Sequence, residues 1–191
     1  MKEKLTLRNA ILWTVSLVAL ILFFCSFAAS ARLRGTIEGD YIDMTCSTVV
    51  WGSRAILGTS DGHPIGEVIA KSVASIPGII GALLLLLASG GLVVITLLLK
   101  NEKLAKALTF VCGGVMLVAG VLLFFVSEAP WYVLKEWMNE EGDYVDIATL
   151  KKYYAGLKAT SGYGIGGGIV TILLAAGVVA TQFIPDKKFI K

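Results

Sequence analysis

The sequence predicts an all-α membrane protein, a four-transmembrane-helix bundle that carries a small extracellular antiparallel β-sheet. Three observations predict this class. Residues 10–30, 73–99, 107–127 and 163–184 contain no charged side chain. Lysines are concentrated in the segments at one end of these stretches, and a segment at the other end alternates like a strand. We interpret residues 1–191 as a single integral membrane domain.

Each uncharged stretch is long enough to cross a membrane as a helix. An α-helix rises about 1.5 Å per residue, so about 20 residues cross the roughly 30 Å hydrocarbon layer. A core helix of a soluble protein would carry a charged stripe, and none of the four stretches does. The predicted helices leave two outer loops, residues 31–72 and 128–162.

The first stretch has an alternative interpretation as a cleaved signal peptide. Ala29-Ser30-Ala31 has the small residues of a cleavage site. However, the apolar run from Ile11 to Ala29 is nearly unbroken, whereas a signal core has about 7 to 15 apolar residues. We therefore expect a retained helix over residues 10–30.

The distribution of lysine predicts the orientation. Basic residues outnumber acidic ones in the N-terminal tail, in the short turn around Lys103 and in the C-terminal tail. Cytoplasmic segments of membrane proteins carry such an excess, so we expect both termini on the cytoplasmic side of the cell membrane. This arrangement also accounts for the net charge of +3, and no nucleic-acid partner is expected.

The first outer loop predicts an antiparallel sheet resting on the outer helix ends. Residues 36–51 alternate between the two faces of a strand. One face is mostly apolar: Ile42, Met44, Cys46, Thr48 and Val50. Further strands are expected at residues 53–58 and 63–69, because Asp61-Gly62 between them favours a tight hairpin turn.

The second outer loop predicts two short helices. Pro130 suits a first helical turn, and Asp146 can cap a helix in which apolar residues recur at steps of three and four. These recurring residues are Ile147, Leu150, Tyr154 and Leu157.

Aromatic residues are frequent in and next to this loop, on the predicted outer side of the membrane: Trp131, Tyr132, Trp137, Tyr144, Tyr153, Tyr154 and Tyr163. We interpret them as an interfacial belt, with a ligand-binding groove as the alternative. The candidates for outer-face contacts are Trp51, Trp131, Trp137, Tyr153 and Tyr154.

Small residues predict how the four helices pack. In lipid, helices associate through close backbone approach and interhelical hydrogen bonds, so small residues on one face mark the contacts. The residues expected there are Ser16, Ala19, Ser26, Gly78, Gly81, Gly113, Gly120, Gly164, Gly168 and Ala175. Pro77 lies near the outer end of its predicted helix, where a kink or a later start of the helix would destabilise it least.

The three cysteines predict no intramolecular disulfide. Cys25 and Cys112 lie in predicted helices, and only Cys46 lies in an outer loop. Without a partner on the oxidising side, Cys46 is expected to be a buried, small apolar residue. A disulfide between two chains through Cys46 is the alternative.

No catalytic, metal or cofactor site is predicted. The single histidine, His63, is interpreted as a turn residue beside Pro64. The acidic residues 140–146 lack the regular alternation of a calcium loop, so a solvated turn is expected. The predicted helices contain no ionisable carboxylate, histidine or basic side chain, which disfavours a coupled transport pathway.

The layout resembles the claudin and peripheral-myelin-protein superfamily, with inner termini, a longer first outer loop with strands and a shorter second one. Claudins carry Gly-Leu-Trp followed by two cysteines in the first loop. Here Cys46 precedes Val49-Val50-Trp51-Gly52 and has no second cysteine in that loop, so the resemblance implies no such disulfide. The chain is also similar to small uncharacterised four-span proteins of Gram-positive bacteria, which implies no activity.

The expected function is that of a non-enzymatic interaction protein. Its outer face would bind a protein partner or another copy of the chain, and membrane lipid would surround the bundle. A pore or transporter subunit for a neutral solute is one alternative, because the predicted helices carry weakly polar stripes. A membrane enzyme acting on lipid is another.

Overall fold

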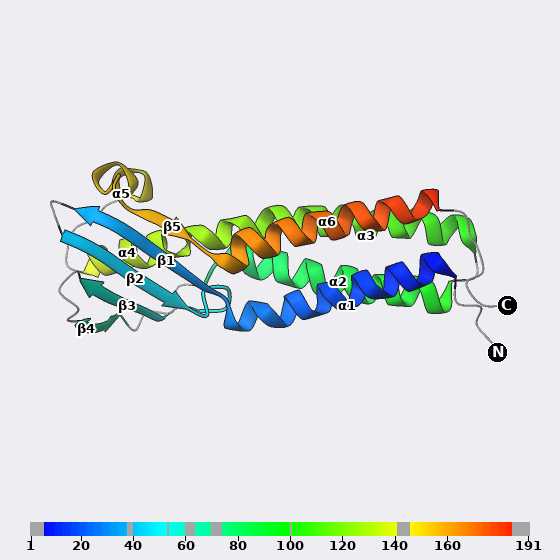
Figure 1. The fold of residues 1–191 in the computed structure, drawn as a ribbon, viewed down its shortest axis with the longest axis horizontal. Coiled ribbons are helices and arrows are strands. Elements are labelled where there is room, and N and C mark those ends of the chain that lie inside the picture. Colours follow the sequence, from blue (N-terminus) through cyan, green and yellow to red (C-terminus); the bar gives the residue numbers. More distant parts are fainter. Residues whose placement is uncertain are drawn as a thin grey trace.

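The computed structural model describes residues 6–37, 40–52, 54–59, 64–69, 74–99, 101–140 and 146–184. Four long helices run side by side (Figure 1). They are α1 (Leu7–Cys25), α2 (Ile76–Leu98), α3 (Glu102–Phe124) and α6 (Gly168–Ala180). With the helical turns at their ends, all four are long and apolar enough to cross a membrane. The prediction of four such helices is confirmed.

One end of the bundle carries a layer that we call the crown. It contains α4 (Ala129–Glu140), α5 (Ile147–Tyr153) and a five-stranded antiparallel sheet in the order β4-β3-β2-β1-β5. The strands are β1 (Ser30–Ile37), β2 (Asp40–Ser47), β3 (Arg54–Thr59), β4 (Pro64–Ile69) and β5 (Lys158–Thr160). The start of α1 and the end of α6 lie at the opposite end of the bundle (Figure 1).

The predicted antiparallel sheet is confirmed, but it is larger than predicted. The strand predicted over residues 36–51 corresponds to β2, which ends at Ser47, and β1 was not predicted. The second loop also contributes β5, which pairs with β1. With three residues, β5 is too short for the two-residue alternation of a strand to be recognised in the sequence. The hairpin turn expected between β3 and β4, with His63, lies outside the described residues.

The third helix continues into the crown, where the sequence predicts a separate short helix that begins near Pro130. The 3₁₀ turn η2 (Phe125–Glu128) connects α3 directly to α4. Pro130 has no N–H, so it cannot donate to the carbonyl of Val126 as a regular α-helix would require. The Ala129 N–H donates to that carbonyl instead, which tightens the turn without ending the helix.

Other helix ends follow from local chemistry. The Ser75 hydroxyl accepts the Gly78 N–H at 3.2 Å, so α2 begins next to Pro77, three residues later than predicted. The Asp146 carboxylate accepts the Thr149 N–H at 2.7 Å and caps α5 as expected. However, α5 ends at Tyr153, and Leu157 reaches the core from a loop.

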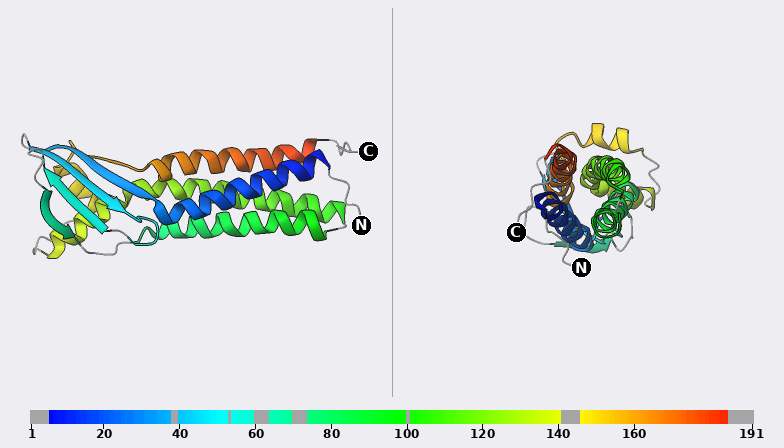
Figure 2. Two further views of the ribbon diagram at one scale, coloured as in Figure 1. Left: turned by 60° about the horizontal axis from the view of Figure 1, so that its bottom comes forward. Right: turned by 90° about the vertical axis from the view of Figure 1, so that its right-hand side faces the viewer.

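Seen end-on, α1, α2, α3 and α6 form a ring (Figure 2). All ten small residues expected at helix contacts are buried. Helices α3 and α6 approach closely, because a Cβ built on Gly120 would lie 2.8 Å from Ile172 Cγ1 and 3.0 Å from the Gly168 carbonyl oxygen. Backbones this close are typical of helix pairs that associate in lipid.

Hydrogen bonds between α1 and α2 supplement this packing. The Ser16 hydroxyl donates to the Ser89 carbonyl oxygen at 2.8 Å, and the Ser89 hydroxyl donates to the Ser16 carbonyl oxygen at 3.0 Å. The Trp13 indole N–H donates to Thr96 Oγ1 at 2.8 Å. Sequence analysis missed Ser89 and Thr96, although their seven-residue spacing puts them on one helix face.

Replacing Gly120 with alanine is expected to destabilise the bundle, because the new methyl group would overlap α6. Overpacking of this kind costs about 1–3 kcal/mol. Gly114 is the matched control on the same helix, since an added Cβ there meets nothing within 4 Å. Thermal unfolding in detergent measures both variants, and equal unfolding temperatures would contradict the close approach of α3 and α6.

Candidate interaction site at the junction of bundle and crown

A single apolar core extends from the end of the bundle into the crown. Val126 in η2 is fully buried at its centre. The bundle contributes Ala82 and Leu123, and the crown contributes Leu33, Met44, Cys46, Ala129, Val133 and Leu150. Because these side chains form one cluster, the crown is packed onto the bundle and is not a tethered appendage.

The loop after β2 packs between the sheet and the helix ends. Thr48 adopts a left-handed conformation, with a φ of 52°, which turns Val49 and Val50 into the core, where both are fully buried. The Val49 N–H donates to the Ala29 carbonyl oxygen at 3.1 Å, and the Ser75 N–H donates to the Val49 carbonyl oxygen at 3.2 Å. One residue thereby connects the end of α1 to the start of α2.

Trp51 anchors the same loop to the first helix. Its ring stacks on Phe27 with 5.0 Å between ring centroids and an interplanar angle of 7°. Its indole N–H donates to the Ser26 hydroxyl at 2.8 Å. Trp51 is therefore engaged within the chain.

The remaining outer-face candidates have different surroundings. Trp131 is only 4% exposed and packs in the shared core, so its ring contacts the chain itself. Tyr154 is half-buried against that core. Tyr153 on α5 is 78% exposed and is available to a partner. The side chain of Trp137 lies outside the described residues.

An ion pair holds α5 against η2. Lys151 donates to the Glu128 carboxylate, and its ammonium nitrogen lies 6.0 Å from the centre of the Trp131 ring. Both charged side chains are partly exposed, so the pair fixes geometry more than it adds stability.

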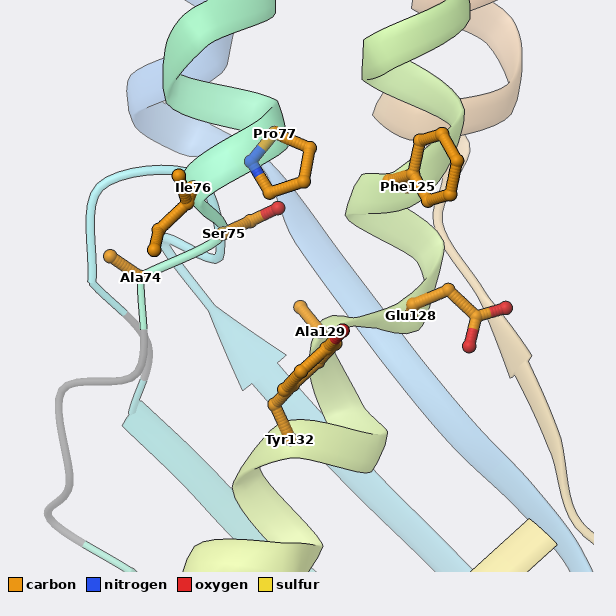
Figure 3. Close-up of a pocket in the computed structure, with 8 residues that line it drawn as sticks. All are labelled: Ala74, Ser75, Ile76, Pro77, Phe125, Glu128, Ala129 and Tyr132. Carbon is orange, nitrogen blue, oxygen red and sulfur yellow. The ribbon is translucent and has the colours of Figure 1, made fainter. Parts of the chain in front are cut away.

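Beside this ion pair lies an apolar pocket of about 260 Å³, which we call the junction pocket. Figure 3 shows the start of α2 on one side, and η2 with the first turns of α4 on the other. The lining residues are Ala74, Ser75, Ile76, Pro77, Phe125, Glu128, Ala129 and Tyr132. Pockets for drug-sized ligands are usually about 300–1,000 Å³, so this one suits a large side chain or the end of an acyl chain.

Polar chemistry inside the junction pocket is limited. The Ser75 hydroxyl already accepts the Gly78 N–H, and the Glu128 carboxylate points away from α2 and pairs with Lys151. Ile76, Phe125 and Tyr132 are exposed at the pocket. The pocket can therefore hold an apolar group by burial, with the ion pair beside it.

Sequence analysis did not predict the junction pocket, because the pocket depends on the unbroken path from α3 to α4. Pro77 and Pro130 were the available signals, since each allows a helix to begin close to the membrane boundary.

The acidic run of the second loop is described only in part. Hydrogen bonds from the Thr149 backbone and side chain lower the pKa of Asp146, whose carboxylate caps α5. Glu141 and Asp143 lie outside the described residues. Among the described side chains, no three of His, Cys, Asp or Glu gather closely enough to hold a metal ion.

Cys46 is fully buried on β2, as predicted, and burial raises the pKa of its thiol to about 12. Cys112 is half-buried, and Cys25 is exposed on α1. Because only the thiolate is a good nucleophile, burial also makes the Cys46 side chain chemically unreactive.

We expect a water-soluble maleimide to label Cys46 in the folded protein at pH 8 about a thousandfold more slowly than an ordinary cysteine, from the pKa difference alone. Unfolding in denaturant should restore ordinary labelling. Peptide mass spectrometry distinguishes Cys46 from Cys25 and Cys112. Rapid labelling of Cys46 without denaturant would mean that the crown separates from its core.

No protein-family model matches this chain, and the search of curated proteins found no matching sequence.

Proposed function

We propose that the chain is a multi-pass cell-membrane protein that acts as a non-enzymatic interaction protein. Its partner is a second membrane protein, and the partner inserts an apolar side chain into the junction pocket. The observation that carries this proposal is the pocket itself, whose rim exposes Ile76, Phe125 and Tyr132 on elements fixed by the shared core. An exposed apolar pocket on rigid elements is a typical anchor point for a partner side chain.

The proposed orientation has the crown outside the cell and both chain ends in the cytoplasm. Arg8 donates to Gln182 Oε1 at 2.8 Å, which joins the two terminal helices at the end far from the crown. Lys103 and Lys106 are exposed on α3 at that same end. The positive-inside bias favours the cytoplasm for this end.

The claudin-like layout is part of this proposal. The first loop supplies four strands, the turn between α2 and α3 is tight, and the second loop supplies two short helices and one strand. Only Cys46 lies in the first loop, so the proposal includes no disulfide and no barrier-forming role.

The packing of the bundle favours an interaction protein over a pore made by one chain. Large apolar side chains fill the interior, and Leu12, Leu85, Leu92 and Met116 are almost inaccessible. The buried hydroxyl groups of Ser16, Ser89 and Thr171 have hydrogen-bond acceptors within the chain. These three buried hydroxyl groups therefore need no water-filled path to satisfy their hydrogen bonds.

A photoreactive amino acid at Ile76 or Tyr132 is expected to crosslink to one discrete protein in native membranes. The same probe at Leu98, which is exposed at the other end of α2, is the positional control and should not give this adduct. Because Ala74 lines the junction pocket, Ala74→Trp should fill it and reduce the adduct at least about tenfold, as loss of a buried anchor does.

Ala176→Trp, at an exposed alanine on α6, is the matched control and should leave the adduct unchanged. Gel shifts and mass spectrometry identify the adducts. Protein adducts of equal yield from Leu98, or adducts that survive Ala74→Trp, would contradict the proposed role of the junction pocket.

A further inference from the structure

The sheet has one buried face and one exposed, basic face. Along β1, Ala31 and Leu33 are buried in the shared core, so Arg32 and Arg34 project from the other side and are exposed. Residues directly opposite on neighbouring strands share a face. Arg32 therefore has Thr45 of β2 on one side and Thr160 of β5 on the other.

Charge on this face is unbalanced. Asp43 of β2 lies opposite Arg34, and Arg34 Nε donates to Asp43 Oδ2 at 3.0 Å. On the other side, Lys158 of β5 lies directly opposite Arg34. Like charges in this position destabilise a sheet. Across the described side chains of β1, β2 and β5, the exposed face carries Arg32, Arg34 and Lys158 against the single carboxylate of Asp43.

The basic face begins where the apolar surface of the bundle ends. Phe27 is exposed in the last turn before β1, and Arg32 follows five residues later. In the second outer loop, Lys158 lies seven residues before Ile165, an exposed apolar residue in the π-helical turn that leads into α6. The strands leave the bundle obliquely (Figure 2), so their height above it grows more slowly than their length.

Arg32 lies within side-chain reach of the layer of lipid head groups. A strand rises about 3.3 Å per residue, so Arg32 is at most about 17 Å from Phe27. The polar region of each leaflet adds roughly 5–8 Å beyond the hydrocarbon. Long arginine and lysine side chains bend toward this region and bring their charges to it.

From charge and height together, we infer that the exposed face of β1, β2 and β5 binds the phosphate of an anionic phospholipid in the adjacent leaflet. The guanidinium of Arg32 can donate two parallel hydrogen bonds to phosphate oxygens. Thr45 and Thr160 flank it with hydroxyl donors, and the anion offsets the repulsion between Arg34 and Lys158. The inference rests on the proposed membrane orientation, but it does not depend on the junction pocket or its partner.

The test uses the full chain in lipid nanodiscs. The nanodiscs contain either a photoactivatable phosphatidylglycerol or a photoactivatable phosphatidylcholine. Both lipids have the same acyl chains, and both carry the reactive group near the phosphate. Mass spectrometry maps the adducts to peptides. We expect phosphatidylglycerol adducts on β1 and β5, and several times fewer with phosphatidylcholine, because only the former carries net negative charge.

Arg32→Gln and Lys158→Gln should each reduce the phosphatidylglycerol adducts on the sheet by on the order of fivefold, the usual effect of one basic residue near an anionic surface. The double variant should reduce them about 25-fold if the two cations act independently. Lys103→Gln/Lys106→Gln removes two exposed lysines at the opposite end of the bundle, so it should leave the sheet adducts unchanged. Thermal unfolding should show no loss of stability in Lys158→Gln, because this change removes a repulsion.

Equal labelling by the two lipids, or sheet adducts that survive Arg32→Gln/Lys158→Gln, would overturn the inference. Competition by millimolar inorganic phosphate at constant ionic strength would also overturn it, because the face would then select free phosphate over a head group. Each of these results leaves the protein crosslink from Ile76 unaffected, so this inference and the proposed function can fail separately.

Discussion

The shared apolar core around Val126 is the constraint on which the rest of the structure depends. At this point the helical path leaves the bundle through η2 and enters α4, which packs on the buried face of the sheet. Val49 connects the end of α1 to the start of α2 around the same core. The crown therefore has a fixed orientation relative to the four helices, and any surface it carries has a fixed height above the membrane.

Two surfaces follow from this constraint. The continuation of α3 into α4 separates α4 from the start of α2 and leaves the junction pocket between them. Packing of α4 on one face of the sheet leaves the other face, with Arg32 and Lys158, exposed. The pocket is apolar and the sheet face is basic, so the ligands that we propose for them differ: a partner side chain for the pocket and a lipid phosphate for the sheet face.

Features set by local chemistry were predictable from the sequence, and features set by distant contacts were not. The four apolar helices follow from the absence of charge, and the start of α5 follows from Asp146. In contrast, β5 exists because Ala159 pairs with Leu33, far away in the sequence. The junction pocket depends on how η2 passes Pro130, which composition does not reveal. The sequence predicts that Trp131 belongs to an interfacial aromatic belt, but its side chain is buried in the core that the sheet and the helices share.

The most direct test of the account asks whether the crown and the chain ends lie on opposite sides of the membrane. In a Cys25→Ser/Cys112→Ser background, in which only the buried Cys46 remains, a new cysteine replaces Lys158 in the crown or Lys103 at the other end. A membrane-impermeant maleimide is then applied to intact cells. The account predicts labelling at position 158 in intact cells and at position 103 only after permeabilisation. Labelling at position 103 in intact cells, or at both positions alike, would contradict it.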